Sequence, residues 1–177
     1  MKNYQTSEIK NVVLLGAPGS GKTTFAEAMA FEGKVIDRRG SIENENTLSD
    51  NTDLEHSNRR SIYSTILYTE FMNHKLNIID APGSDDFSGG LFAAFKVADV
   101  GLMLFNAQNG FEVGSEIQSR YAKTYNVPLV GVINQLDSEK ANWEGTLESI
   151  ASFSKVKPIV VQYPVNPGPG FDAFIDV

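Results

Sequence analysis

The sequence predicts an α/β fold with a mainly parallel six-stranded sheet, one antiparallel edge strand, and helices on both faces of the sheet. Three observations support this prediction. Short apolar runs alternate with stretches of helical periodicity, which is the pattern of βαβ units. Two strand-like runs at 62–71 and 76–79 flank a turn and indicate an antiparallel hairpin at a sheet edge. The chain of 177 residues is long enough for one domain with its own core.

The expected elements follow one another in a regular order. Residues 12–15 form a short apolar run, which predicts the first buried strand. Residues 23–32 carry apolar side chains at helical spacing and are followed by Gly33, a common stop signal for a helix. The hairpin comes next. Beyond it, the same patterns predict helices at 92–98, 112–125 and 141–153, and strands at 100–105, 129–133 (buried) and 159–161.

Two segments depart from this alternation. We expect residues 1–163 to form the domain, and residues 164–177, with several prolines and glycines, to form a turn-rich exit from it. Residues 37–60 are polar and almost lack large apolar side chains. A structureless stretch of this length inside a compact domain is uncommon and is often functional. A solvated insertion without a function is the alternative interpretation.

Composition excludes several kinds of site. The chain has no cysteine, which excludes a disulfide scaffold, a thiolate metal site and a cysteine nucleophile, and its two histidines argue against a multi-histidine zinc site. A net charge of −7 argues against autonomous nucleic-acid binding, because phosphate contacts need clustered lysine and arginine. No apolar run is long enough for a bilayer, and the start lacks the apolar stretch of a signal peptide. We therefore expect a cytoplasmic protein.

Residues 16–23, with the sequence GAPGSGKT, fit the phosphate-binding loop pattern and stand between a predicted strand and a predicted helix, as in P-loop NTPases. Successive backbone N–H groups of such a loop point toward phosphate oxygens. We expect Lys22 to reach the β- and γ-phosphates, Thr23 to ligate Mg²⁺, and Thr24 to bond the α-phosphate. The other residues expected around the phosphates are Gly16, Ala17, Pro18, Gly19, Ser20 and Gly21.

Two further motifs follow predicted strands. Asp80 and Gly83 belong to an Asp-x-x-Gly motif, in which the aspartate can hold a water bound to Mg²⁺ and the glycine can offer its N–H to a γ-phosphate. Asn134, Gln135 and Asp137 belong to the sequence NQLD. A carboxylate at Asp137 can accept hydrogen bonds from N1–H and N2–H₂ of guanine, two donors that adenine lacks there, and Asn134 would tie this loop to the phosphate loop. A helix cap is the alternative reading of the NQLD motif.

The three motifs, in this order, resemble those of translational GTPases, most closely elongation factor G and its paralogues. The similar blocks are residues 76–83, 86–87, 98–100, 110–116, 132–137, 161–164 and 170–171. This resemblance implies a GTP-binding domain that uses GTP or GDP and Mg²⁺, hydrolyses GTP, and acts as a monomer on the ribosome, away from membranes. A later guanine-contacting motif of the family is not found in these residues, so we expect a piece of a longer multidomain factor.

The resemblance also gives the polar stretch a role, because residues 37–60 correspond to the first switch loop of the family. An alignment without gaps back from Asp80 places Ser61 on the family threonine that ligates Mg²⁺, and a serine hydroxyl can do the same chemistry. The metal site implied is therefore Thr23, Ser61 and, through water, Asp80.

Three residues depart from the family pattern. Ser84 stands where the family has the histidine that orients the attacking water, Gln135 replaces a lysine, and Gly19 replaces an aspartate. Lys22, Gly83 and Ser84 occupy the positions expected to act in hydrolysis. The departures imply that hydrolysis is attenuated more than nucleotide binding is.

Two other functions compete with an active GTPase. A non-hydrolysing, GTP-gated binding module would share every binding motif and differ only at Ser84. A phosphotransferase of the nucleoside monophosphate kinase type has a similar phosphate loop, but it needs several arginines around two nucleotides and an arginine-rich lid. The chain has only five arginines, Arg38, Arg39, Arg59, Arg60 and Arg120, and no such lid.

Overall fold

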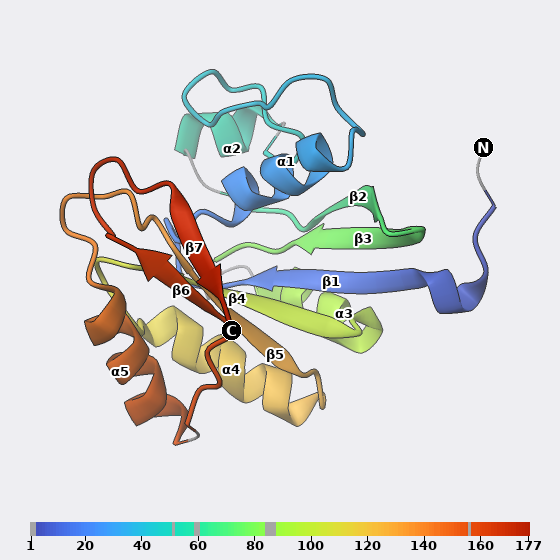
Figure 1. The fold of residues 1–177 in the computed structure, drawn as a ribbon. Coiled ribbons are helices and arrows are strands. Elements are labelled where there is room, and N and C mark those ends of the chain that lie inside the picture. The colour runs from blue at the N-terminus through green and yellow to red at the C-terminus, as the bar shows by residue number, and fades with distance from the viewer. Residues whose placement is uncertain (1–2, 51, 59–60, 84–87, 156) are drawn as a thin grey trace.

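The computed structural model describes residues 3–50, 52–58, 61–83, 88–155 and 157–177. Their strands form a five-stranded sheet in the order β2-β3-β1-β4-β5 and a separate two-stranded sheet of β6 and β7 (Figure 1). Every neighbouring pair in the larger sheet is parallel except β2 and β3. The α/β class and the antiparallel edge are therefore confirmed.

The elements agree in type and order with most of the predicted ones. They are η1 (Thr6–Glu8), β1 (Ile9–Leu15), α1 (Lys22–Glu32), α2 (Asp53–Asn58), β2 (Thr65–Phe71), β3 (His74–Asp80), α3 (Ser88–Val97), β4 (Val100–Asn106), α4 (Val113–Thr124), β5 (Leu129–Asn134), α5 (Trp143–Ser154), β6 (Gln162–Val165) and β7 (Ala173–Asp176). None of the helices in the described ranges is long and apolar enough to cross a membrane.

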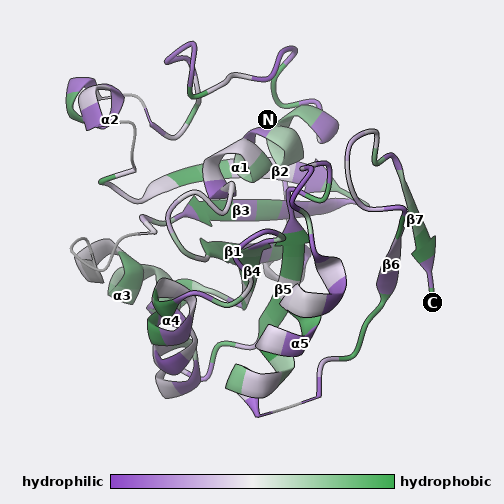
Figure 2. Ribbon diagram, turned by 90° about the vertical axis from the view of Figure 1, so that its left-hand side faces the viewer, coloured by the Kyte–Doolittle hydropathy of each residue, from purple (hydrophilic) through white to green (hydrophobic). Residues whose placement is uncertain are grey.

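Apolar side chains on the two faces of the sheet form two cores, and Figure 2 shows the hydrophobic residues concentrated in the strands. Because side chains alternate along a strand, Val13 and Leu15 of β1 face one core while Val12 and Leu14 face the other. The first core packs against α3, α4 and α5, and the second packs against α1. Helices therefore cover both faces of the sheet.

The parallel strands bring the three predicted motifs to the same edge of the sheet. Leu14 of β1 pairs with Asp80 of β3, and Asn106 of β4 pairs with Asn134 of β5. The carboxyl ends of parallel strands lie together, and the loops that follow them form the usual ligand crevice of an open α/β sheet. The phosphate loop, the Asp-x-x-Gly motif and the NQLD motif all begin there.

The prediction of a sixth strand in the main sheet, at 159–161, is wrong. These residues form no strand, and the next segment, β6, pairs with β7 in an antiparallel hairpin. This pairing is local, because only a short loop separates the two strands, so closing it costs little chain entropy. The expected turn-rich exit at 164–177 therefore contains β7 and the end of β6.

The expectation that β5 is buried is also wrong. Among the described strands, β5 pairs only with β4, so one edge of β5 is open. Leu129 is 39% exposed and Val130 is 49% exposed as a result. The polar stretch differs from expectation as well, because it contains α2.

The turn between β2 and β3 provides a test of the fold. Met72 and Asn73 have φ angles of 46° and 63°, the left-handed pair typical of a two-residue hairpin turn, and Met72 is 77% exposed. Asparagine tolerates this conformation better than methionine, so Met72→Asn should raise the free energy of unfolding by up to about 1 kcal/mol. Urea denaturation measures the change. Met72→Gln, which keeps the unfavourable φ, is the control, and an equal gain in both variants would contradict the turn assignment.

Candidate nucleotide-binding site

The phosphate loop and the Asp-x-x-Gly motif are in direct contact. A Cβ atom added at Gly83 would lie 2.5 Å from Lys22 Nζ and 2.9 Å from the backbone nitrogen of Pro18. Only glycine fits such a close approach of two backbones. The backbone of Gly83 thus lies next to the ammonium group of Lys22, the lysine that is expected to hold phosphates.

Lys22 is buried at the start of α1, and its ammonium donates hydrogen bonds to the carbonyls of Gly16 and Ala17, at 2.9 and 3.1 Å. Burial lowers the pKa of Lys22 to about 8, and the negative charges of Asp80, Asp50 and Glu112 oppose that shift. A group with this pKa still carries its proton at neutral pH. Within the described residues, the hydrogen-bond acceptors of this cation are therefore two neutral carbonyl oxygens.

The three residues predicted to hold a metal lie together. Thr23 Oγ1 donates to Asp80 Oδ2 at 2.9 Å and lies 3.3 Å from Ser61 Oγ. The other carboxylate oxygen of Asp80 is buried and makes no hydrogen bond of normal geometry among the described residues. Burial raises the pKa of this carboxyl, and the side chains of Ser49 and Thr23 and the charge of Lys22 oppose that shift. Hydroxyl and carboxylate oxygens are ligands that Mg²⁺ prefers, together with phosphates. The residues present therefore fit a magnesium ion.

The NQLD loop is tied to the phosphate loop by two side-chain amides. Asn134 Nδ2 donates to the carbonyl of Ser20 at 2.9 Å, and Gln135 Nε2 donates to the carbonyl of Gly19 at 2.8 Å. Gln135 Oε1 in turn accepts from Asn106 Nδ2 at 2.6 Å. The structure thus places Asn134 as the sequence predicted, next to the phosphate loop.

For the other predicted site residues, the structure gives only their exposure or does not describe them. Asp137 and Thr24 are exposed, which leaves both side chains accessible to a ligand. The N–H of Gly168 donates to the carbonyl of Leu136 at 2.7 Å and so holds the residue next to Asp137. Ser84 lies outside the described residues, as do 85–87.

Two buried glutamates that sequence reasoning missed hold the polar stretch. Glu27 of α1 accepts from the N–H groups of Gly40, at 3.0 Å, and Leu48. Glu55 of α2 accepts from the N–H groups of Ile62 and Tyr63, both at 3.1 Å. No signal for Glu27 was available in the sequence, because this residue lies off the face of the predicted helix that carries the apolar side chains.

The hydrogen bonds to Glu55 also set its ionisation. Burial alone would raise the pKa of the Glu55 carboxyl, but hydrogen bonds from the Ile62 N–H, the Thr52 side chain and the Tyr63 N–H bring this pKa below its ordinary value. The carboxylate is therefore charged at neutral pH. It fixes the backbone that immediately follows Ser61.

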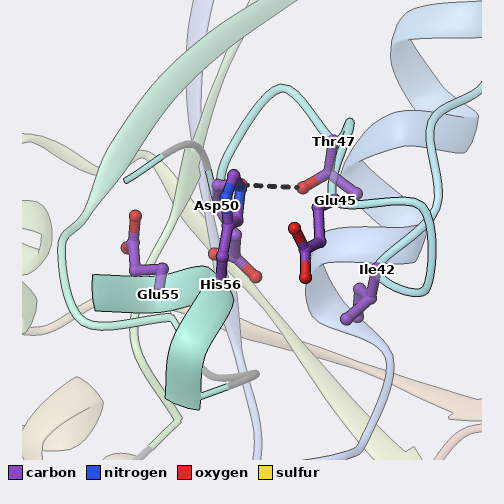
Figure 3. Close-up of a pocket in the computed structure, with 6 residues that line it drawn as sticks. All are labelled: Ile42, Glu45, Thr47, Asp50, Glu55 and His56. Atoms are coloured by element: carbon purple, nitrogen blue, oxygen red, sulfur yellow. Dashed lines mark hydrogen bonds between the residues drawn. The ribbon is translucent and has the colours of Figure 1, made fainter. Parts of the chain in front are cut away.

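Asp50, in the polar stretch, is a further buried acidic residue that the sequence did not single out. His56 Nε2 lies 2.9 Å from the Asp50 carbonyl, and Thr47 donates to the same carbonyl at 3.4 Å (Figure 3). Burial raises the pKa of the Asp50 carboxyl. The pocket drawn in Figure 3 has a volume of about 10 Å³, which holds no more than one water, so it is not a site for a nucleotide.

Comparison with known proteins decides the family. The family model "Elongation factor Tu GTP binding domain" matches residues 7–174, nearly the whole chain. The chain belongs to this family of GTP-binding domains. The family binds guanine nucleotides, and the resemblance drawn from the three motifs is confirmed.

Relatives within the family include elongation factors G. The chain is 30% identical to elongation factor G of Salinibacter ruber over 176 residues, which cover 99% of this chain and 25% of that protein. It is 32% identical to elongation factor G of Dehalococcoides mccartyi over 165 residues, which cover 93% of this chain and 24% of that protein. The mitochondrial ribosome-releasing factor 2 of Danio rerio is 27% identical over 175 residues, which cover 99% of this chain and 23% of that protein. The chain thus spans about a quarter of the length of these relatives.

A solved structure supports the same assignment. A crystal structure of a protein from Thermus thermophilus matches with a TM-score of 0.88 and 30% sequence identity, over 96% of this chain and 26% of that one. The fold of this chain therefore matches that of a solved structure over nearly its whole length.

The contacts of Glu27 lead to a testable expectation for the polar stretch. Glu27→Ala removes the acceptor of two backbone N–H groups, and hydrogen bonds to a charged group are worth about 1.5–3 kcal/mol each. Hydrogen exchange at Gly40 and Leu48 should therefore become at least about tenfold faster, while the exchange of β1 stays unchanged.

Glu32→Ala, which removes an exposed glutamate from the same helix, is the matched control. The role given to Glu27 would be wrong if both variants exchanged Gly40 and Leu48 at the wild-type rate.

Proposed function

We propose that this chain binds GTP and GDP together with Mg²⁺ and forms the GTP-binding domain of an elongation factor G-like translation factor that acts on the ribosome. The observation that carries the proposal is the convergence of Lys22, Thr23, Asp80 and Ser61 at the carboxyl edge of the sheet. Lys22 and the loop N–H groups would hold the phosphates, and Thr23, Ser61 and Asp80 would hold the metal. Mg²⁺ supplies charge neutralisation between the β- and γ-phosphates when bound.

Choice of guanine is assigned to Asp137. Its carboxylate is exposed, it follows the buried Leu136, and the preceding Asn134 and Gln135 are fixed on the phosphate loop. A base at this position would therefore be held at a set distance from the phosphates. The aliphatic part of Gln135 would lie against the base in place of the family lysine.

Base specificity gives the first test of this function. GDP should bind and ADP should not, measured by calorimetry with Mg²⁺. Asp137→Asn should weaken GDP binding by at least about tenfold and improve binding of the xanthine nucleotide, because the amide donates where the carboxylate accepts. Equal affinity for GDP and ADP would contradict the guanine assignment. Asp172→Asn, an exposed aspartate in the β6–β7 loop, is the control and should change neither affinity.

We further propose that GTP hydrolysis is slow. Hydrolysis needs a group that orients the attacking water, and Ser84 cannot replace the imidazole of the family at that position. Positioned groups of this kind are worth about 10²–10⁴ in rate. Phosphate binding depends on Lys22 and the loop N–H groups instead, so affinity for GTP should survive. A non-hydrolysing, GTP-gated regulator of the ribosome is the second candidate function. Ser84 favours it as well, because loss of the water-orienting group would leave GTP bound without being hydrolysed.

Single-turnover GTP hydrolysis on ribosomes tests this proposal with the natural full-length chain. Wild type should be slower than an ordinary elongation factor G by about 10²-fold or more, and Ser84→His should recover part of the rate. Ser88→His, a few residues further along the chain, is the control and should recover nothing. A wild-type rate equal to that of an ordinary elongation factor G would overturn the attenuation. A complete absence of hydrolysis in wild type would favour the regulator.

We also propose that residues 1–163 act within a longer multidomain factor, with 164–177 beginning the connection to an inserted subdomain. The open edge of β5 supports this, because unpaired strand edges with exposed apolar residues are usually covered in stable proteins. A strand from a further segment would cover it. Hydrogen exchange of β5 should then be slower in the natural full-length chain than in residues 1–177 alone.

A further inference from the structure

Gln118 is a buried polar residue to which neither the motifs nor the proposed function assigns a role. It lies in α4, is 2% exposed, and contacts the phosphate loop across 102 residues of sequence. Its Oε1 accepts from the N–H of Gly16 at 2.7 Å, and its Nε2 lies 3.5 Å from the carbonyl of the same residue. One side chain therefore reaches both polar groups of the first loop residue.

Gly16 is the point where the chain leaves β1 and begins to curve around the phosphates. Its φ angle is +131°, and a Cβ there would collide with the carbonyl of Leu104 in β4. Its position is thus defined on one side by β4 and on the other by Gln118. A small rotation of the backbone at Gly16 would change the direction of the N–H groups that follow in the loop.

The carbonyl of Gly16 currently also accepts from Lys22 Nζ. If the ammonium moves to a phosphate, this carbonyl loses its charged donor. Gln118 Nε2, already 3.5 Å away, can then close the distance and take over as donor. A buried carbonyl left unpaired would otherwise oppose the movement of Lys22.

We propose that Gln118 is a positioning residue for nucleotide binding: it holds the first peptide of the phosphate loop in place and replaces Lys22 as the partner of the Gly16 carbonyl when Lys22 engages phosphate. This proposal rests on the proposed function. It connects α4 to the nucleotide through a single buried side chain, so displacement of α4 changes the affinity for phosphates.

The test compares Gln118→Met with wild type, since methionine has a similar length but neither donates nor accepts a strong hydrogen bond. Affinities for GDP and GMP are measured with Mg²⁺ at a temperature where unfolding curves show both proteins folded. GDP binding should weaken about tenfold, the loss expected for one buried hydrogen bond. GMP binding should change less than about twofold, because GMP lacks the β-phosphate that draws Lys22 away from the Gly16 carbonyl, so Gln118 is not needed as the replacement donor.

Gln162→Met is the matched control. It removes a glutamine side chain that donates to Asp176 at 2.8 Å on the exposed β6–β7 hairpin, and should leave both affinities unchanged. Exchange of the Gly16 amide in the nucleotide-free protein is a second measurement, and it should be faster in Gln118→Met only. If Gln118→Met does not fold, Gln118→Asn, whose amide is one methylene shorter, takes its place with the same expected results.

Each result bears on the proposal. A lower unfolding midpoint with unchanged GDP affinity would show that Gln118 only stabilises the fold, and an equal loss for GDP and GMP would show that it does not act through the loop; either overturns the proposal. If wild type binds no guanine nucleotide, the proposed function fails. In that case, hydrogen exchange of the Gly16 amide that is the same in Gln118→Met as in wild type would separately overturn the role of Gln118 in holding Gly16.

Discussion

The buried charge of Lys22 is the constraint on which the rest of the site depends. The ammonium remains protonated at neutral pH although burial lowers its pKa to about 8, and its acceptors are the carbonyls of Gly16 and Ala17. Ionised oxygens form stronger hydrogen bonds with an ammonium than carbonyls do. The loop therefore encloses a cation whose best partner is an anion, which is the physical reason that the site suits phosphates.

Several elements hold the loop around that charge. Asn134 and Gln135 bind its carbonyls from the end of β5, Gln118 binds Gly16 from α4, and Asp80 reaches Thr23 from the end of β3. The contacts from β3 and β5 occur because parallel strands end at one edge of the sheet. Glu27 and Glu55 hold backbone N–H groups within and just after the polar stretch, and Ser61 lies next to Thr23.

The sequence predicted the parts of this site that depend on local patterns. The loop at 16–23, the Asp-x-x-Gly motif and the NQLD motif are contiguous, and their strand and helix context could be read directly. The position of Ser61 beside Thr23 followed from an alignment without gaps. Gln118 could not be found in this way, because its partners are the backbone groups of Gly16, which leave no trace in residue identity. For Glu55, the pair with Thr52 three residues earlier was visible as a capping-box pattern, but its bonds to the backbone of Ile62 and Tyr63 were not. The prediction of a strand at 159–161 in the main sheet was wrong because the next residues, β6, pair with the nearby segment β7 instead.

The proposed function treats nucleotide binding and GTP hydrolysis separately. In the proposed function, phosphate and metal contacts would use Lys22, Thr23 and Asp80, whereas Ser84 stands where the resemblance places a water-orienting histidine. Membership of the family of GTP-binding domains agrees with the nucleotide-binding part of the proposed function, and the proposed loss of hydrolysis rests on Ser84.

A crystal structure of the protein with Mg²⁺ and a non-hydrolysable GTP analogue tests the central claim most directly. We expect Lys22 Nζ to leave the carbonyls of Gly16 and Ala17 for β- and γ-phosphate oxygens, with guanine on Asp137 and the loop backbone otherwise unchanged. Lys22 still bound to both carbonyls, or a nucleotide bound away from Asp137, would contradict the account.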